Sequence, residues 1–201
     1  MTAARSSFLL SLMLIVPLYG SALGQRRLPD PQLPSRCEPG EQRTRLEEFE
    51  AKAQTVVIKG STRVAILNTS SGSARVEALE LRDTGDSSRA TGVAITLKDS
   101  TRQSNAESRS YIDYEEIDPL IKGLDSVAHS DETITKLTSF EARYRTRGDF
   151  EITVFRQTSG GIAATLASGT FDRVAISLSL DELGKLRWMI LQAKVRLDET
   201  K

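Results

Sequence analysis

The sequence predicts an α+β protein with antiparallel sheets, arranged in two pseudo-repeated units of about four strands that are each closed by an amphipathic helix. Within residues 56–98 and 137–179, short segments separated by turns show a period of two, which is typical of half-buried strands. A segment of helical periodicity follows each of these regions. The order of strands and then a helix, met twice, therefore defines the fold class.

The two halves also resemble each other in sequence. The hexapeptide Gly92–Leu97 matches Gly161–Leu166 at four of six positions, 69 residues apart, and the openings of the two helices align at a spacing of 66. This favours one repeated unit. Chance similarity between amphipathic elements is the alternative, because alternating strands and capped helices recur widely. The two units would cover about 55–129 and 134–198.

The first 24 residues have the order of a secretory signal peptide. Arg5 precedes an apolar run from Phe8 to Leu18, and small residues follow up to Gly24. A membrane anchor is the alternative, but a span needs roughly 20 apolar residues and Pro17 interrupts this run. We therefore expect cleavage near Gln25, no stable membrane span afterwards, and export to the periplasm or the extracellular space.

Residues 25–43 hold four of the six prolines and predict a flexible tether before a single domain over residues 44–201. The lone cysteine, Cys37, lies in this tether and has no partner for an internal disulfide. It is either a spare thiol or a point for an intermolecular bridge. Without residues 1–24 the chain keeps 26 Lys plus Arg against 27 Asp plus Glu, so no general attraction to nucleic acid is expected.

A short amphipathic helix over residues 44–53, in which Leu46 and Phe49 recur at helical spacing, precedes the first unit. A polar turn at 59–62 separates two short strands. Residues 99–110 are polar and are interpreted as a solvated loop. The four strands of this unit are predicted over residues 56–58, 63–67, 75–81 and 92–98.

The helix that closes the first unit has two possible starts. Asp113 aligns with Ser179 of the second unit and would be its cap. Alternatively Asp118 is the cap and Pro119 stands at the first helical position. The only histidine, His129, lies at the expected C-terminus, where it can cap carbonyl groups.

The second unit opens with a hairpin of two strands, over residues 137–145 and 149–155. A three-residue loop, Thr146–Gly148, would pair Tyr144 with Phe150, so that the apolar faces of both strands meet. It would also place Gly148 at a positive φ.

Three arginines on this hairpin, Arg143, Arg145 and Arg147, resemble a basic strand that could follow a phosphate backbone. The predicted register sets Arg143 opposite Glu151. It also sets Arg145 opposite Asp149, so cross-strand ion pairs match two of the three charges. The preferred interpretation is a solvated face, and no nucleic acid is expected as a partner.

Two more strands are predicted over residues 161–166 and 173–179. A helix follows them, which begins at a capping box of Ser179 and Glu182 and runs to about Leu197. This helix has two apolar stripes, and a helix with apolar residues on both sides is usually buried on both. The second stripe is therefore a possible contact with a protein partner or another copy. The first stripe consists of Leu183, Leu186, Ile190, Ala193 and Leu197, and the second of Trp188, Leu191 and Val195.

Few residues suggest catalysis. The densest carboxylate cluster, Asp113, Glu115, Glu116 and Asp118, lacks the glycine and distal glutamate of a calcium loop, and acids in a first helical turn are expected from the helix dipole. A second histidine or a cysteine cluster for zinc is absent, as is a Gly-x-Ser-x-Gly motif. We therefore assign no catalytic residue, metal or cofactor.

The element order of residues 55–198 resembles the Whirly single-stranded DNA-binding proteins, which also have two tandem units of four strands and a helix in one chain. The segment Ile176-Ser-Leu-Ser-Leu-Asp-Glu-Leu183 is similar to the strand-to-helix junction of that group. The resemblance implies a topology and no binding residue. More generally, the chain resembles exported proteins of Gram-negative-type bacteria.

These observations together favour an exported, soluble, non-enzymatic binding or structural module of the cell envelope. A carboxylate-based hydrolase or transferase is one alternative, because distant loops could bring acids together. Single-stranded nucleic-acid binding by a Whirly-like fold is the other.

Overall fold

The computed structural model describes residues 43–101, 106–130, 135, 139–170 and 172–201. The chain divides into two compact parts, residues 1–38 and residues 39–201, and the described residues all belong to residues 39–201. The expected signal peptide, Cys37 and all but the last residue of the expected tether lie outside the described residues.

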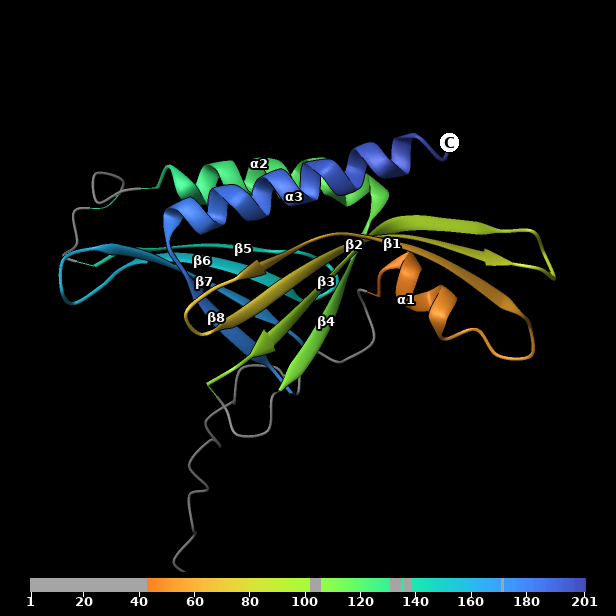
Figure 1. The fold of residues 1–201 in the computed structure, drawn as a ribbon, viewed down its shortest axis with the longest axis horizontal. Helices are drawn as coiled ribbons and strands as arrows, with labels where there is room; N and C mark the ends of the chain where they lie inside the picture. The colour runs from red at the N-terminus through yellow and green to blue at the C-terminus, as the bar shows by residue number, and fades with distance from the viewer. Residues whose placement is uncertain (1–42, 102–105, 131–134, 136–138, 171) are drawn as a thin grey trace, which may run out of the picture. The chain divides into compact units, whose positions relative to one another are not determined.

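The fold is α+β, with two antiparallel four-stranded sheets that are each followed by a helix (Figure 1), and this confirms the prediction of two ββββα units. Sheet A has the order β1-β2-β3-β4 and sheet B the order β5-β6-β7-β8. The elements are α1 (Arg45–Glu50), β1 (Val57–Asn68), β2 (Gly72–Asp83), β3 (Arg89–Asp99), β4 (Glu107–Asp113), the 3₁₀ helix η1 (Tyr114–Glu116), α2 (Ile117–Ala128), β5 (Glu141–Arg145), β6 (Phe150–Arg156), β7 (Ile162–Ser168), β8 (Val174–Leu178) and α3 (Leu180–Asp198).

β1 is one strand of 12 residues, so the prediction of two short strands with a turn at 59–62 is wrong. The polar segment pairs throughout with β2, from Lys59 opposite Leu81 to Thr62 opposite Ala78. β1 lies at the edge of sheet A, where exposed polar side chains and a glycine are tolerated. A change of register between Arg63 and Ala65 marks a β-bulge.

β4 occupies residues that were expected to be part of a solvated loop, and this prediction is also wrong. Its serines face sheet B: the hydroxyl oxygens of Ser110 and Ser168 are 2.7 Å apart, and those of Ser108 and Ser168 are 3.1 Å apart. Buried serines that bond one another satisfy their polar groups. A strand that buries serine does not show the alternation of apolar residues by which strands are predicted.

The β5–β6 hairpin has a three-residue loop as predicted, but the loop begins one residue later than expected, at Arg147. The amide of Thr146 donates to the carbonyl oxygen of Phe150 across 2.8 Å, and Tyr144 pairs with Ile152 instead of Phe150. The register thus differs by two residues from the predicted one. Because side chains alternate with a period of two, the apolar faces still meet.

Asp149, and not Gly148, takes the left-handed conformation in this loop, with a φ of 57°. Glycine is needed at position 148 for a different reason. A Cβ atom there would lie 2.0 Å from the carbonyl oxygen of Tyr111, so only glycine allows the loop to approach β4 this closely.

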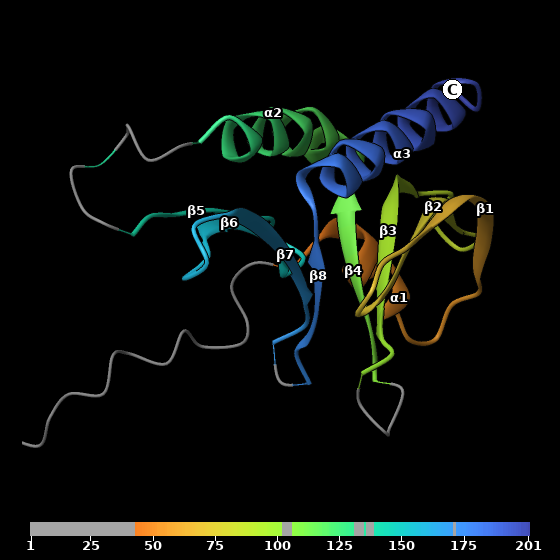
Figure 2. The ribbon, with the colours of Figure 1, turned by 60° about the vertical axis from the view of Figure 1, so that its left-hand side comes forward.

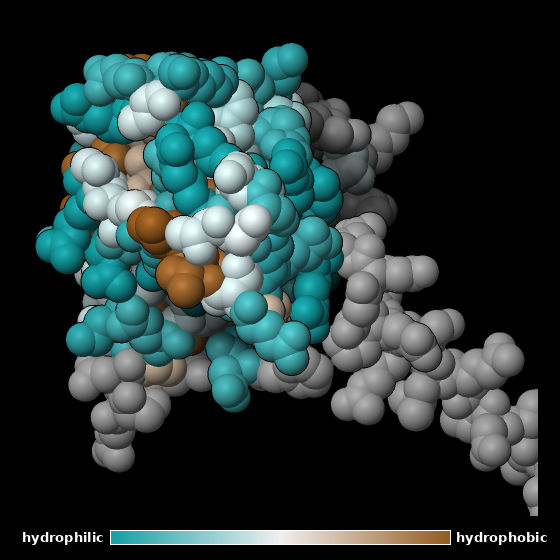
Figure 3. All heavy atoms as spheres, turned by 90° about the vertical axis from the view of Figure 1, so that its right-hand side faces the viewer, coloured by the Kyte–Doolittle hydropathy of each residue, from teal (hydrophilic) through white to brown (hydrophobic). Residues whose placement is uncertain are grey.

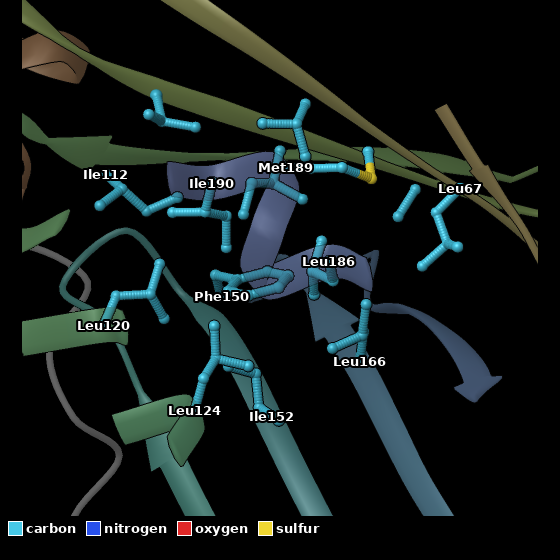
Figure 4. Packing of buried hydrophobic residues seen from close by; sticks show 14 of the residues in the cluster. Leu67, Ile112, Leu120, Leu124, Phe150, Ile152, Leu166, Leu186, Met189 and Ile190 are labelled. Atoms are coloured by element: carbon cyan, nitrogen blue, oxygen red, sulfur yellow. The ribbon is translucent and has the colours of Figure 1, made fainter. Parts of the chain in front are cut away.

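Helices α2 and α3 lie side by side over one face of the two sheets, as the views in Figures 1 and 2 agree. One hydrophobic core joins both helices to both sheets. Figure 4 shows Phe150 of β6 among side chains of α2 and α3, and it is fully buried. The first apolar stripe predicted for α3 is confirmed, since all its members are buried: Leu183, Leu186, Ile190, Ala193 and Leu197.

α1 covers part of the opposite face of sheet A and forms a second apolar cluster. Leu46 and Phe49 pack there with Leu79, Leu81 and Tyr111. The helix is shorter than the predicted range of 44–53. Its N-terminus is closed by a capping box of Thr44 and Glu47.

The predicted equivalence of Asp113 with Ser179 as helix caps is wrong. Asp113 makes no side-chain bond to the helical turn that follows it. Its carboxylate instead accepts the amides of Arg45 at 2.9 Å and Leu46 at 3.1 Å, so it holds the start of α1. The alternative start is wrong as well, because α2 begins at Ile117 and Asp118 lies inside its first turn. Pro119 also lies in this turn, where an amide donor is not needed.

Candidate interaction surface

α3 starts at a capping box, as the sequence predicts. The hydroxyl of Ser179 accepts the amide of Glu182 at 3.2 Å, and the Glu182 carboxylate accepts the amide of Ser179 at 2.7 Å. Both bonds satisfy amide groups that the helix itself leaves without partners.

Two ion pairs join α2 to α3 and orient α3. The ammonium of Lys194 lies 2.6 Å from Asp118, and the guanidinium of Arg187 binds both carboxylate oxygens of Asp125 at 2.6 and 2.9 Å. The Arg187 hydrogen bonds lower the pKa of Asp125, and the bond to Asp118 raises the pKa of Lys194. The pairing of 118 with 194 and of 125 with 187 means that the two helices are antiparallel.

The second apolar stripe of α3 is not buried on the described part of the chain, contrary to expectation. Trp188 is 57% exposed and Val195 47% exposed, while Leu191 is half-buried and packs against the core. The three residues that the sequence singled out therefore lie on one outward-facing strip of the helix.

Sequence reasoning missed two further members of this strip, Leu180 and Gly184. Leu180 is 38% exposed, and a Cβ added to Gly184 would meet no atom within 4 Å. The signal was present in the spacing, because positions 184, 188, 191 and 195 are separated by four, three and four residues. This is the a/d spacing of a coiled-coil seam. We call Leu180, Gly184, Trp188, Leu191 and Val195 the outer stripe of α3.

The other large apolar side chains that are exposed in the described residues lie elsewhere. Val56, Ile58 and Ile66 belong to β1 and the residue before it, and Ile162 begins β7. Figure 3 shows the face on the right-hand side of Figure 1, which is largely hydrophilic around one small apolar cluster. Single exposed apolar residues are common on protein surfaces, whereas aligned ones require an explanation.

The carboxylate cluster at the start of α2 has a structural role. The guanidinium of Arg147 lies 3.8 Å from Asp113, 3.9 Å from Glu115 and 3.6 Å from Glu116. Asp118 points instead to Lys194 on α3. Among the residues that the structure describes, no group of three or more His, Cys, Asp or Glu side chains is placed to hold a metal ion.

His129 has the capping role that its position suggested. It stands at the C-cap of α2, and its Nδ1 atom lies 2.6 Å from the carbonyl oxygen of Asp125. The same carbonyl oxygen also accepts the backbone amide of His129 at 3.1 Å, so the ring adds a second contact at the C-terminal end of the helix.

The arginines of the β5–β6 hairpin have acidic neighbours. Arg143 lies 3.8 Å from Glu151, and Arg145 pairs with Asp149. Both predicted ion pairs are thus present, although the register differs, because long side chains reach diagonal neighbours as well as direct ones. Arg147 lies in the carboxylate cluster described above.

Comparisons with protein-family models, curated proteins and solved structures gave no match to the chain. Among the described residues, none of the helices combines the length and the hydropathy that crossing a membrane would need.

Proposed function

We propose that the chain is an exported, non-enzymatic structural module of the cell envelope, and that the outer stripe of α3 binds a second copy of the chain. The observation that carries this proposal is the exposure of Trp188, at 57%, in the middle of an apolar strip on a helix that is buried on its other side. Burial of tryptophan contributes strongly to protein interfaces.

A second copy fits the stripe because the stripe can complement itself. In an antiparallel pairing of two α3 helices, a residues meet d residues of the other copy. Trp188 would then pack beside Leu191 of the second copy, and Val195 would face the open position at Gly184. A two-fold symmetric contact of this kind uses the same patch on both molecules.

The oligomeric state tests this proposal. Light scattering on the chain without residues 1–24 should show a dimer, and Trp188→Asp should convert it to a monomer, because a carboxylate in the seam would lose its hydration. Val56→Asp is the matched control, since Val56 is 64% exposed but lies outside α3. A chain that is monomeric at every concentration, or a Trp188→Asp dimer, would refute the proposal.

Trp188 also supplies a direct optical signal, because it is the only tryptophan. Its emission should shift to shorter wavelength as protein concentration rises and water leaves the indole ring. Emission that is independent of concentration, in a sample that light scattering finds dimeric, would mean that the dimer uses another surface.

Export is tested separately. In a Gram-negative host the full chain should be recovered from the periplasm with an N-terminus near Gln25. Leu14→Arg should retain the uncleaved chain in the cytoplasm, because it interrupts the apolar run of the signal. Recovery of uncleaved wild-type chain from the cytoplasm would contradict this part of the proposal.

A further inference from the structure

α1 covers one end of the outer face of sheet A. Four basic side chains lie on the other part of the same face. Arg75 and Arg109 lie at the centre of this part, and Arg63 and Lys98 belong to neighbouring rows of the same face. Among the described residues of these strands, two acids, Glu77 and Glu107, lie on the same part of the face. These six side chains carry a formal net charge of +2 on a chain whose formal net charge is zero.

The central row of this face crosses four strands, in the order Ile66, Arg75, Thr96, Arg109. Thr96 is 4% exposed, and its hydroxyl has no hydrogen-bond partner. The Nε atoms of Arg75 and Arg109 are also buried without a hydrogen-bond partner. Three donors on adjacent strands thus lack an acceptor, and a buried polar group without a partner is costly.

Both arginines approach a single carboxylate. Glu77 lies 3.2 Å from Nη2 of Arg109 and 3.7 Å from Nε of Arg75. Glu107 lies 3.1 Å from Nη2 of Arg75. With side chains 31% and 29% exposed, the two guanidinium groups remain accessible from the open side of the sheet.

The second unit shows that the fold does not require these arginines. Thr165 occupies the position of Thr96 in the matching hexapeptides, and its row contains Arg143, Thr153 and Ser177. Thr165 is flanked by Thr153 and Ser177, where Thr96 has an arginine on each side. The same sheet position is therefore built with short neutral neighbours in one unit and with paired guanidinium groups in the other.

We propose that Arg75, Arg109 and Thr96 form a binding site for an oxyanion, a carboxylate or a phosphate group of a small ligand. Guanidinium groups bind both oxyanions in bidentate fashion, and two of them on either side of a hydroxyl donor match such a group. Glu77 is the internal carboxylate that occupies the site until the ligand displaces it. This site is separate from the outer stripe of α3 and does not depend on it.

Titration of the full chain followed by NMR tests the site, with inorganic phosphate and acetate added in separate experiments at constant ionic strength. The Nε–H signals of Arg75 and Arg109 should shift together and reach saturation with one affinity. The tighter of the two ions identifies the oxyanion. Arg75→Gln should weaken binding about tenfold or more, as expected for the loss of a charged donor.

Glu77→Gln separates this proposal from a purely structural ion pair. Removing the internal competitor should tighten binding severalfold, whereas a structural role would only lower stability. Thr96→Val removes the hydroxyl without a change of charge and should weaken binding. Arg109→Lys keeps the charge but removes the bidentate geometry, and it should weaken binding as well. Arg143→Gln, in the matching row of the second unit, should leave affinity unchanged.

Two results would overturn the proposal. The first is a titration in which neither ion produces saturable shifts of the two arginine signals. The second is an affinity for the ion that is the same in the wild type, Arg75→Gln and Thr96→Val, when the amide NMR spectra show that all three chains are folded.

Discussion

The backbone amide of Arg147 donates a 2.8 Å hydrogen bond to Oε1 of Glu116, and this bond joins the two ββββα units. Glu116 ends the 3₁₀ helix of the first unit, and Arg147 opens the hairpin loop of the second. The Glu116 side chain is 10% exposed, with its second oxygen 3.6 Å from Nε of Arg147. The tip of one unit is therefore held against the strand-to-helix junction of the other.

We expect Glu116→Ala to lower the free energy of unfolding by about 1–3 kcal/mol, because the Arg147 amide would lose its acceptor. Glu116→Gln keeps a carbonyl oxygen at the same place and should lose less. Chemical denaturation followed by circular dichroism measures both changes.

Glu115→Ala is the control for this prediction. The Glu115 carboxylate is 53% exposed and only approaches Arg147 at 3.9 Å, so its removal should change stability by less than about 1 kcal/mol. If Glu115→Ala and Glu116→Ala lower the free energy of unfolding equally, the hydrogen bond from the Arg147 amide to Glu116 is not what stabilises this junction.

Much of the fold could be predicted because its signals are local. The capping box of Ser179 and Glu182, the period of two in β6 and the buried stripe of α3 each depend on residues close in sequence. The outer stripe containing Trp188 was visible for the same reason. Local patterns report which side of an element is apolar, whatever packs against it.

The features that could not be predicted depend on partners distant in sequence. β4 buries Ser110 because Ser168 satisfies its hydroxyl, and Asp113 caps α1, which precedes it by more than 60 residues. The arginine site on sheet A needs the register of three strands before Arg75, Thr96 and Arg109 form one row. No periodicity in the sequence encodes such pairings.

Gly148→Ala should destabilise the protein by about 1–3 kcal/mol, the usual range for inserting an atom where there is no space. The added Cβ would lie 2.0 Å from the carbonyl oxygen of Tyr111, and a backbone atom cannot rotate away. Gly161→Ala is the matched control, because its Cβ would meet nothing closer than Gln157 at 3.5 Å. Thermal unfolding measures both; a Gly148→Ala protein as stable as Gly161→Ala would contradict the close approach.

Asp113→Ala should release α1 from sheet A. The substitution removes the acceptor of the Arg45 and Leu46 amides, and losing a helix cap costs about 0.5–2 kcal/mol. Hydrogen exchange should accelerate at the Leu46 amide, together with a modest loss of global stability. Asp118→Ala removes only an exposed pair with Lys194 and should leave exchange at Leu46 unchanged. Unchanged protection in Asp113→Ala would refute the cap.

Asp83 lies at the centre of a polar cluster beside the C-terminus of α1. Its side chain is 5% exposed and accepts hydrogen bonds from Lys52 at 2.6 Å, Thr55 at 2.5 Å and the Gly85 amide at 2.8 Å. These donors, Lys52 first, hold the pKa of Asp83 well below its usual value of about 3.9. Hydrogen bonds from Ser88, and after them the bond from Lys52, lower the pKa of Asp86 as well.

A carboxyl group whose pKa is lower in the folded than in the unfolded protein stabilises the fold at a pH above its unfolded-state pKa. This stabilisation is lost as the pH falls through its folded-state pKa. Lys52→Met removes the strongest donor to Asp83, so it should destabilise the protein at neutral pH. The difference from wild type should begin to narrow as pH falls below about 4, because the unfolded chains take up protons there, and it should vanish only as pH falls through the lowered pKa of folded Asp83. Lys185→Met, on the exposed face of α3, is the control and should show no such narrowing. Urea unfolding at a series of pH values measures the difference, and a gap between wild type and Lys52→Met that stays constant down to the lowest pH would contradict the assignment.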